Sequence, residues 1–177
     1  NKPLDDDPND HGTHVSSTIA GNGLAANWIS EGIAPMADIG AVRAFGADGS
    51  GSYIDVIEAI DYIVQNKAKH NIRVLNLSFS ATPRSYYWED PLNQAVMKAW
   101  QAGIVVVAAA GNSGPDPMTI GVPGNVPYVI TVGAMTDNYT PIDSTDDKLA
   151  TFSSTGPTYE GFVKPEVVAP GGHFVCS

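Results

Sequence analysis

Two stretches of this chain, residues 53–69 and residues 91–102, repeat apolar residues with the spacing of an amphipathic helix. Apolar residues at i, i+3, i+4 and i+7 share one face of a helix, because the helix has about 3.6 residues per turn. The positions that fit are Val56, Ala59, Ile60, Ile63 and Val64 in the first stretch and Leu92, Ala95, Val96, Ala99 and Trp100 in the second. The pattern predicts two helices, each with one face toward a core.

The residues at the ends of these stretches support the same prediction. Ser52 followed three residues later by Asp55 is typical of a capping box at a helix start. Asp90 and Pro91 have the side chains expected at an N-cap and at the first helical position, and Gly103 is typical of a helix end. Both helices therefore have signals that mark where they begin or end.

Short apolar runs without alternation lie between and after the helices, at residues 39–44, 73–79, 104–110 and 128–134. Continuous apolarity in such short runs predicts strands covered on both faces, hence a parallel sheet. Residues 150–154 and 166–169 are shorter strand candidates. The alternation of strands and helices predicts an α/β fold with three layers, a mostly parallel sheet flanked by helices.

The places where two of the predicted strands end are candidates for a binding site. Ligands of open α/β sheets bind beyond the carboxyl ends of the strands. Residues 78–80 and residues 111–113 each follow a predicted strand directly, so we expect them at that edge of the sheet.

Composition narrows the class of protein. The 177 residues, 43% of them hydrophobic, suffice for one domain with a sizeable core. A net charge of -10 with only nine Lys and Arg argues against a nucleic-acid partner. No stretch approaches the ~20 apolar residues of a membrane span, so we expect no membrane partner. The single cysteine, Cys176, has no partner for an internal disulfide.

Several motifs occur in the order found in one enzyme family. The segment D-H-G-T-H-V at residues 10–15 resembles the histidine box of subtilisin-like serine peptidases, and A-A-A-G-N-S-G at residues 108–114 resembles their asparagine box. The segments F-S-S-T-G-P at residues 152–157 and K-P-E-V-V-A-P-G at residues 164–171 resemble two further boxes of the family. The resemblance implies a subtilisin-like fold and, as function, a secreted serine endopeptidase.

The two central boxes each carry a candidate catalytic residue. A serine nucleophile needs an imidazole to accept its proton and return it to the leaving amine, and the resemblance assigns this role to His11. The negative charge on a tetrahedral intermediate is stabilised by an amide donor, which the resemblance assigns to Asn112. His11 and His14 are also spaced as metal ligands could be, but no third ligand box follows them, and zinc needs three or four.

The resemblance also implies a set of substrate-binding residues. The two edges that would pair with an extended peptide are formed by Gly49, Ser50 and Gly51 and by Ser78, Phe79 and Ser80. The pocket for one of the peptide's side chains would be lined by Ala110, Gly111 and Gly121. Ser80 departs from the glycine usual in the family, and its hydroxyl would narrow the first specificity pocket. Residues 49–53 also suggest a dinucleotide-binding loop, but the third glycine of that fingerprint would fall at Ile54.

Two residues of the family's catalytic triad have no counterpart here. The family's Asp lies roughly 30 residues before its His, yet only ten residues precede His11, and Ser177 lacks the G-T-S-x-A surround of a nucleophile. We expect residues 1–177 to be the central part of a peptidase domain, inactive alone and either self-associated or paired with the missing segments. The alternative is a catalytically inactive domain that binds peptides or self-assembles.

Metal binding is left open at the acidic segment D-D-D-P-N-D of residues 5–10. Oxygen-rich loops bind calcium, but Pro8 interrupts the spacing and no distal Glu completes a cage, which favours a solvated loop. The resemblance alone implies structural calcium; no organic cofactor is expected, and no metal ligands are assigned.

Overall fold

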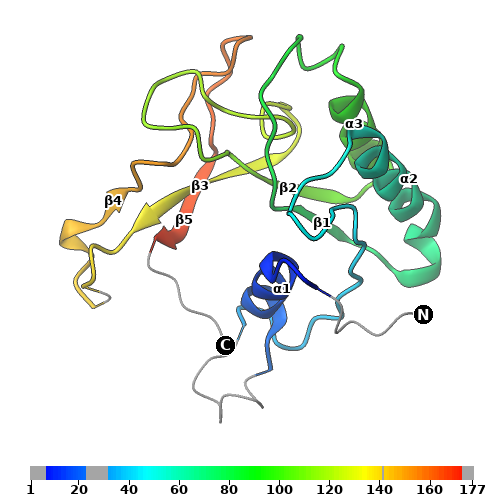
Figure 1. Cartoon of the computed structure of the whole chain (residues 1–177), viewed down its shortest axis with the longest axis horizontal. Helices are drawn as coiled ribbons and strands as arrows, with labels where there is room; N and C mark the ends of the chain where they lie inside the picture. The colour runs from blue at the N-terminus through cyan, green and yellow to red at the C-terminus, as the bar shows by residue number, and fades with distance from the viewer. Residues whose placement is uncertain (1–6, 23–31, 141, 173–177) are drawn as a thin grey trace. The chain divides into compact units, whose positions relative to one another are not determined.

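The computed structural model describes residues 7–22, 32–140 and 142–172. They form two compact units, with the boundary between Ala59 and Ile60. Figure 1 shows the elements of both units.

Unit 1 contains helix α1 (His11–Ala20) and the start of helix α2 (Tyr53–His70). The strand predicted at residues 39–44 is wrong, because these residues form no ladder, and Ile39 and Val42 are exposed. Their composition suits a strand, but a strand also requires a neighbour that accepts and donates its backbone hydrogen bonds. No strand of unit 1 among the described residues provides such a partner.

Unit 2 is built on a mostly parallel sheet (Figure 1). The strands β1 (Val74–Leu77), β2 (Val105–Ala109) and β3 (Ile130–Thr136) are neighbours in that order and run parallel. Strand β5 (Val167–Gly172) pairs parallel with β3, and β4 (Lys148–Leu149), which follows the 3-10 helix η1 (Ser144–Asp146), pairs antiparallel with it. The arrangement confirms the predicted α/β fold, a parallel sheet with flanking helices.

Two strand predictions near the end of the chain had different outcomes. Residues 166–169 do lie in or beside β5, which starts one residue later than predicted. Residues 150–154 form no strand and instead make a turn, in which the Ser153 N–H donates to the Ala150 carbonyl. The prediction of a strand there is therefore wrong.

The helix ends follow the sequence signals. Helix α3 (Pro91–Gln101) begins with Asp90, whose carboxylate accepts hydrogen bonds from the backbone N–H groups of Leu92 and Asn93. At the start of α2 the Ser52 hydroxyl accepts from the Asp55 N–H at 3.1 Å. Gly103 follows α3 with a φ of 77°, the left-handed conformation that ends a helix.

The sheet buries one face, whereas the other face is exposed at the start of each central strand and half-buried farther along β2 and β3. Leu75, Leu77, Val106 and Ala108 alternate with exposed or half-buried neighbours and belong to the core, as do apolar residues of α3. Val74, Val105 and Ile130, on the opposite face, are 58%, 49% and 42% exposed. The expectation of strands covered on both faces is therefore wrong for the described residues, although the sequence is as apolar as such burial requires.

Candidate active site

His11 is the first residue of α1 and is exposed. Asp10, at the N-cap position, has a left-handed backbone with φ 65° and makes no side-chain cap. Instead Asp7 caps this end, because its Oδ2 accepts from the Thr13 N–H at 2.7 Å and from the Thr13 hydroxyl at 2.9 Å. These hydrogen bonds lower the pKa of Asp7 below its ordinary value. A charged cap therefore fixes the turn that carries His11.

The segment with Gly49, Ser50 and Gly51 lies in the same unit as His11. Its turn is closed by Asp48, whose carboxylate accepts from the Ser50 N–H at 3.0 Å and from the Ser50 hydroxyl at 2.8 Å, which lowers the pKa of Asp48. Gly49 has a φ of 75°. The Asn9 amide donates to the Ala47 carbonyl at 3.4 Å, so the turn contacts the residues that lead into α1.

Unit 2 brings three of the predicted substrate-binding segments together at the carboxyl end of its sheet. Ala81, just beyond β1, pairs antiparallel with Val122 through hydrogen bonds of 2.9 and 2.8 Å. The Gly121 N–H donates to the carbonyl of Ala110, just beyond β2, at 2.9 Å. Residues 78–81, 110–112 and 121–122 are thus neighbours although they are distant in sequence.

Gly111 lies between two serine hydroxyls. Its φ of 112° is one that residues with a side chain rarely adopt. A Cβ at this position would lie 2.8 Å from the hydroxyl oxygens of both Ser80 and Ser154. A Cβ on Gly121 would likewise overlap the Ser80 hydroxyl. The Ser80 side chain therefore lies against two glycines of the predicted specificity pocket.

Asn112 is exposed at the end of this segment, and Ser154 holds the backbone on both sides of it. The Ser154 N–H donates to the Gly111 carbonyl at 2.9 Å, and the Ser154 Oγ accepts from the Ser113 N–H at 3.1 Å. Sequence reasoning had assigned no role to Ser154 individually. The signal in the sequence that includes Ser154 is the segment F-S-S-T-G-P at residues 152–157, which resembles a box of the family.

The unit also contains an ion pair between the buried Lys164 and the partly exposed Glu166, beside the start of β3. The Lys164 Nζ lies 2.6 Å from Glu166 Oε1 and donates to the Val129 carbonyl at 2.9 Å. The other carboxylate oxygen of Glu166 accepts from the Thr131 N–H at 2.8 Å. Burial lowers the pKa of Lys164, and Glu166 offsets this only in part. Burial opposes the charge on Glu166, but the hydrogen bonds from Lys164 and Thr131 outweigh it and lower the pKa of Glu166.

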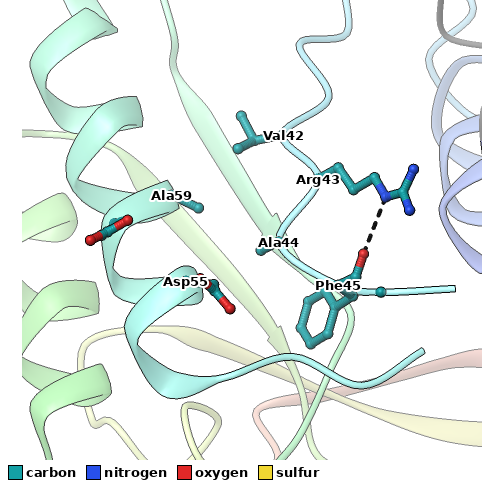
Figure 2. A pocket seen from close by; sticks show the side chains of 8 residues that line it. Val42, Arg43, Ala44, Phe45, Asp55 and Ala59 are labelled. Carbon is teal, nitrogen blue, oxygen red and sulfur yellow. Dashed lines mark hydrogen bonds between the residues drawn. The ribbon is translucent and has the colours of Figure 1, made fainter. Parts of the chain in front are cut away.

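Unit 1 has a cavity of about 690 Å³ between residues 42–46 and the start of α2 (Figure 2). Figure 2 shows Arg43 at its edge, with the guanidinium Nε donating to the Phe45 carbonyl at 3.2 Å. Asp55 and Glu58 also line it. None of the predicted catalytic or substrate-binding residues lines this cavity, but it adjoins the segment of residues 49–51, because the Gly46 N–H donates to the Ser50 carbonyl at 2.8 Å.

The described part of the chain shows neither a metal cluster nor a membrane helix. No three His, Cys, Asp or Glu side chains within it are grouped to hold a metal ion. Asp7, the described acidic residue of the 5–10 segment that precedes Pro8, is engaged with Thr13 instead. The helices among these residues are too short or too polar to cross a membrane. The Asp residues at positions 5 and 6 lie outside the described residues.

Comparison with known proteins gives the family. The model described as "Subtilase family" matches residues 1–177. The chain belongs to the subtilase family. Its predicted relationship to subtilisin-like peptidases is confirmed, and with it the fold.

Subtilases similar to this chain include characterised serine proteases. Serine protease AprX of Bacillus subtilis is 42% identical over 98% of this chain and 40% of its own length. Subtilisin DY of Bacillus licheniformis is 38% identical over 93% of this chain and 52% of its length. Among solved structures, sphericase matches with a TM-score of 0.74 and 28% identity, over 89% of this chain and 51% of its own. The chain thus spans between 40% and 52% of these three subtilases.

The candidate site residues of this subtilase are divided between its two units. His11 and residues 49–51 belong to unit 1, whereas Asn112, residues 78–80, Ala110, Gly111 and Gly121 belong to unit 2.

Proposed function

We propose that this chain is the central part of the catalytic domain of a secreted serine endopeptidase, which hydrolyses peptide bonds through an acyl-enzyme. The observation that carries the proposal is the placement of Asn112. It stands exposed beyond β2, its backbone is held on both sides, and the segment of residues 78–81, in which Ala81 pairs with Val122, lies beside it. Family membership supplies the reaction type.

In the proposed reaction His11 acts as general base and then as general acid. Its imidazole accepts the proton of the nucleophilic serine hydroxyl while the serine oxygen bonds to the substrate carbonyl carbon. The carbonyl oxygen becomes negatively charged and accepts a hydrogen bond from the Asn112 amide. When the C–N bond breaks, His11 gives its proton to the leaving amine. We place the serine nucleophile and the orienting Asp in segments outside residues 1–177.

The proposed substrate is an extended peptide bound along the two edges formed by residues 78–80 and residues 49–51. Ala110, Gly111 and Gly121 would line the pocket for the side chain that precedes the cleaved bond. Because the Ser80 hydroxyl lies against Gly111 and Gly121, we expect this pocket to accept small side chains best.

A second proposal concerns partners. The exposed strand face, on which Val74 and Val105 are register partners, carries large apolar side chains that water contacts in the isolated unit. We propose that the segments with the catalytic Asp and Ser cover it, and that the 177-residue chain alone self-associates through it. The alternative function, an inactive peptide-binding or self-assembling domain, uses the same surfaces without hydrolysis.

Labelling with a fluorophosphonate tests the proposed function, because this reagent bonds to an activated serine oxygen. The full-length gene product should hydrolyse a denatured protein substrate and take up one label per molecule. The purified 177-residue chain should stay unlabelled, because it lacks the proposed nucleophile. A full-length product with neither hydrolysis nor labelling would support the inactive peptide-binding domain instead. Stoichiometric labelling of the 177-residue chain would show that the nucleophile has been misplaced.

A further inference from the structure

The proposed oxyanion donor, Asn112, lies in a short exposed loop that has no strand pairing of its own. An amide donor stabilises a transition state only if its position is fixed before the reaction, because reorganisation would cost part of the gain. The backbone on both sides of Asn112 must therefore be held by other parts of the fold.

Ser154 supplies both of these contacts. Its backbone N–H donates to the carbonyl of Gly111 at 2.9 Å, and its hydroxyl oxygen accepts from the N–H of Ser113 at 3.1 Å. The two bonds attach to the residues immediately before and after Asn112. Ser154 is fully buried, so its own N–H and hydroxyl oxygen are shielded from water in both hydrogen bonds. One residue thus ties down both ends of the peptide segment that carries the amide donor.

The neighbouring serine points to a different part of the fold. Ser153 is equally buried, but its hydroxyl oxygen accepts from the N–H of Ala134 in β3 at 3.0 Å. The two adjacent serines therefore make the same type of hydrogen bond, one to the loop of Asn112 and one to the sheet. Removing either hydroxyl should lower stability through the lost hydrogen bond, but only the loss of the Ser154 hydroxyl should also lower the catalytic rate.

We propose that Ser154 is a positioning residue for catalysis, which fixes the Asn112 amide in the orientation that the oxyanion requires. The inference rests on the proposed peptidase function and on Asn112 as oxyanion donor. It concerns a residue outside the histidine and asparagine boxes, 42 positions after Asn112 in the chain.

The test compares Ser154→Ala with Ser153→Ala in the full-length gene product, using steady-state hydrolysis of a peptide substrate. Each variant deprives one backbone N–H of its acceptor, so both should lower thermal stability to a similar degree. Only Ser154→Ala should lower kcat, by about 10- to 100-fold with little change in KM, since misplacement by about 1 Å costs on the order of 10²-fold. Should Ser154→Ala not fold, Ser154→Cys, whose sulfur accepts a hydrogen bond only weakly, should lower kcat with little change in KM, whereas Ser153→Cys should leave kcat nearly unchanged.

A double-mutant cycle with Asn112→Ala shows whether Ser154 acts through Asn112. Asn112→Ala should lower kcat by about 10²–10³-fold, a magnitude carried over from subtilisin. In that background Ser154→Ala should change kcat by less than about threefold, because there is no amide left to position. Equal kcat values for Ser154→Ala and Ser153→Ala, a change confined to KM, or fully multiplicative effects would each overturn the inference. An unchanged kcat in Asn112→Ala would instead refute the oxyanion assignment on which it rests.

Discussion

The ion pair between the buried Lys164 and the partly exposed Glu166 gives a quantitative prediction about unfolding. We compare Glu166→Gln, which removes the negative charge and keeps the shape, with Lys164→Met, which removes the ammonium and keeps most of the apolar length. The two side chains differ strongly in exposure, 1% for Lys164 and 38% for Glu166. The stability lost when Glu166 is replaced should therefore differ from the stability lost when Lys164 is replaced.

Glu166→Gln should be the more damaging change. It leaves the Lys164 ammonium buried with the Val129 carbonyl, and a single amide oxygen then has to serve both Lys164 and the Thr131 N–H. Breaking a buried ion pair costs about 3–5 kcal/mol. Because more than a third of Glu166 is exposed and water screens the pair, we reduce this to about 2–3 kcal/mol. Lys164→Met leaves Glu166 partly hydrated and orphans only the Val129 carbonyl, for about 0–2 kcal/mol.

Urea unfolding of the full-length gene product and its two variants, followed by circular dichroism, measures both changes in the free energy of unfolding. The pH dependence provides an independent check, because the folded pKa of Glu166 is lower than its unfolded value. Its contribution to stability is complete above the ordinary glutamate pKa of about 4.3 and declines as the pH falls toward the folded pKa. In Glu166→Gln, the part of the fall in stability at low pH that comes from Glu166 should be absent. A larger loss for Lys164→Met than for Glu166→Gln at pH 7 would refute the reasoning.

Three further predictions concern specificity, association and calcium. Ser80→Gly in the full-length gene product should raise kcat/KM by about 10-fold for peptides with a large residue before the cleaved bond, since a pocket contact is worth on the order of 1–3 kcal/mol. Unchanged relative rates for peptides with alanine and with phenylalanine at that position would contradict this prediction. Light scattering on the 177-residue chain should give a mass above that of the monomer because of the exposed strand face, and a sharp monomer at high micromolar concentration would argue against that surface. Structural calcium is expected from the family resemblance, so calcium added to chelator-treated full-length protein should raise its Tm. An unchanged Tm would contradict the presence of structural calcium.

Local signals in the sequence predicted the local structure well. Asp90 and Pro91 mark the start of α3 because the cap and the first turn depend only on residues within one turn. Residues 73–79 and 104–110 contain β1 and β2 because short apolar runs bounded by turns suit buried strands. Residues 39–44 have the same composition and form no strand, since pairing depends on a distant partner that composition does not reveal.

The candidate site was predictable only in part, for the same physical reason. The motifs singled out His11, Asn112 and residues 78–80, and β1 and β2 do end next to the latter two. Ser154 was missed because it holds Ser113 across 41 positions, and no periodicity or local pattern records such a contact. The exposed strand face is in keeping with the expectation of missing segments, but the apolar runs do not identify which face stays uncovered, because they report what a strand could bury and not what covers it.

Peptide hydrolysis by His11→Ala and His14→Ala variants of the full-length gene product tests the central claim most directly. The two histidines share one helix and are both exposed, so His14→Ala is a matched control. We expect His11→Ala to lower kcat by at least about 10⁴-fold, in keeping with the loss of the catalytic histidine in subtilisin, and His14→Ala to lower it far less. A His11→Ala enzyme that retains kcat within about tenfold of the unmodified protein would contradict the assignment of His11 as general base, and with it the proposed function of this chain.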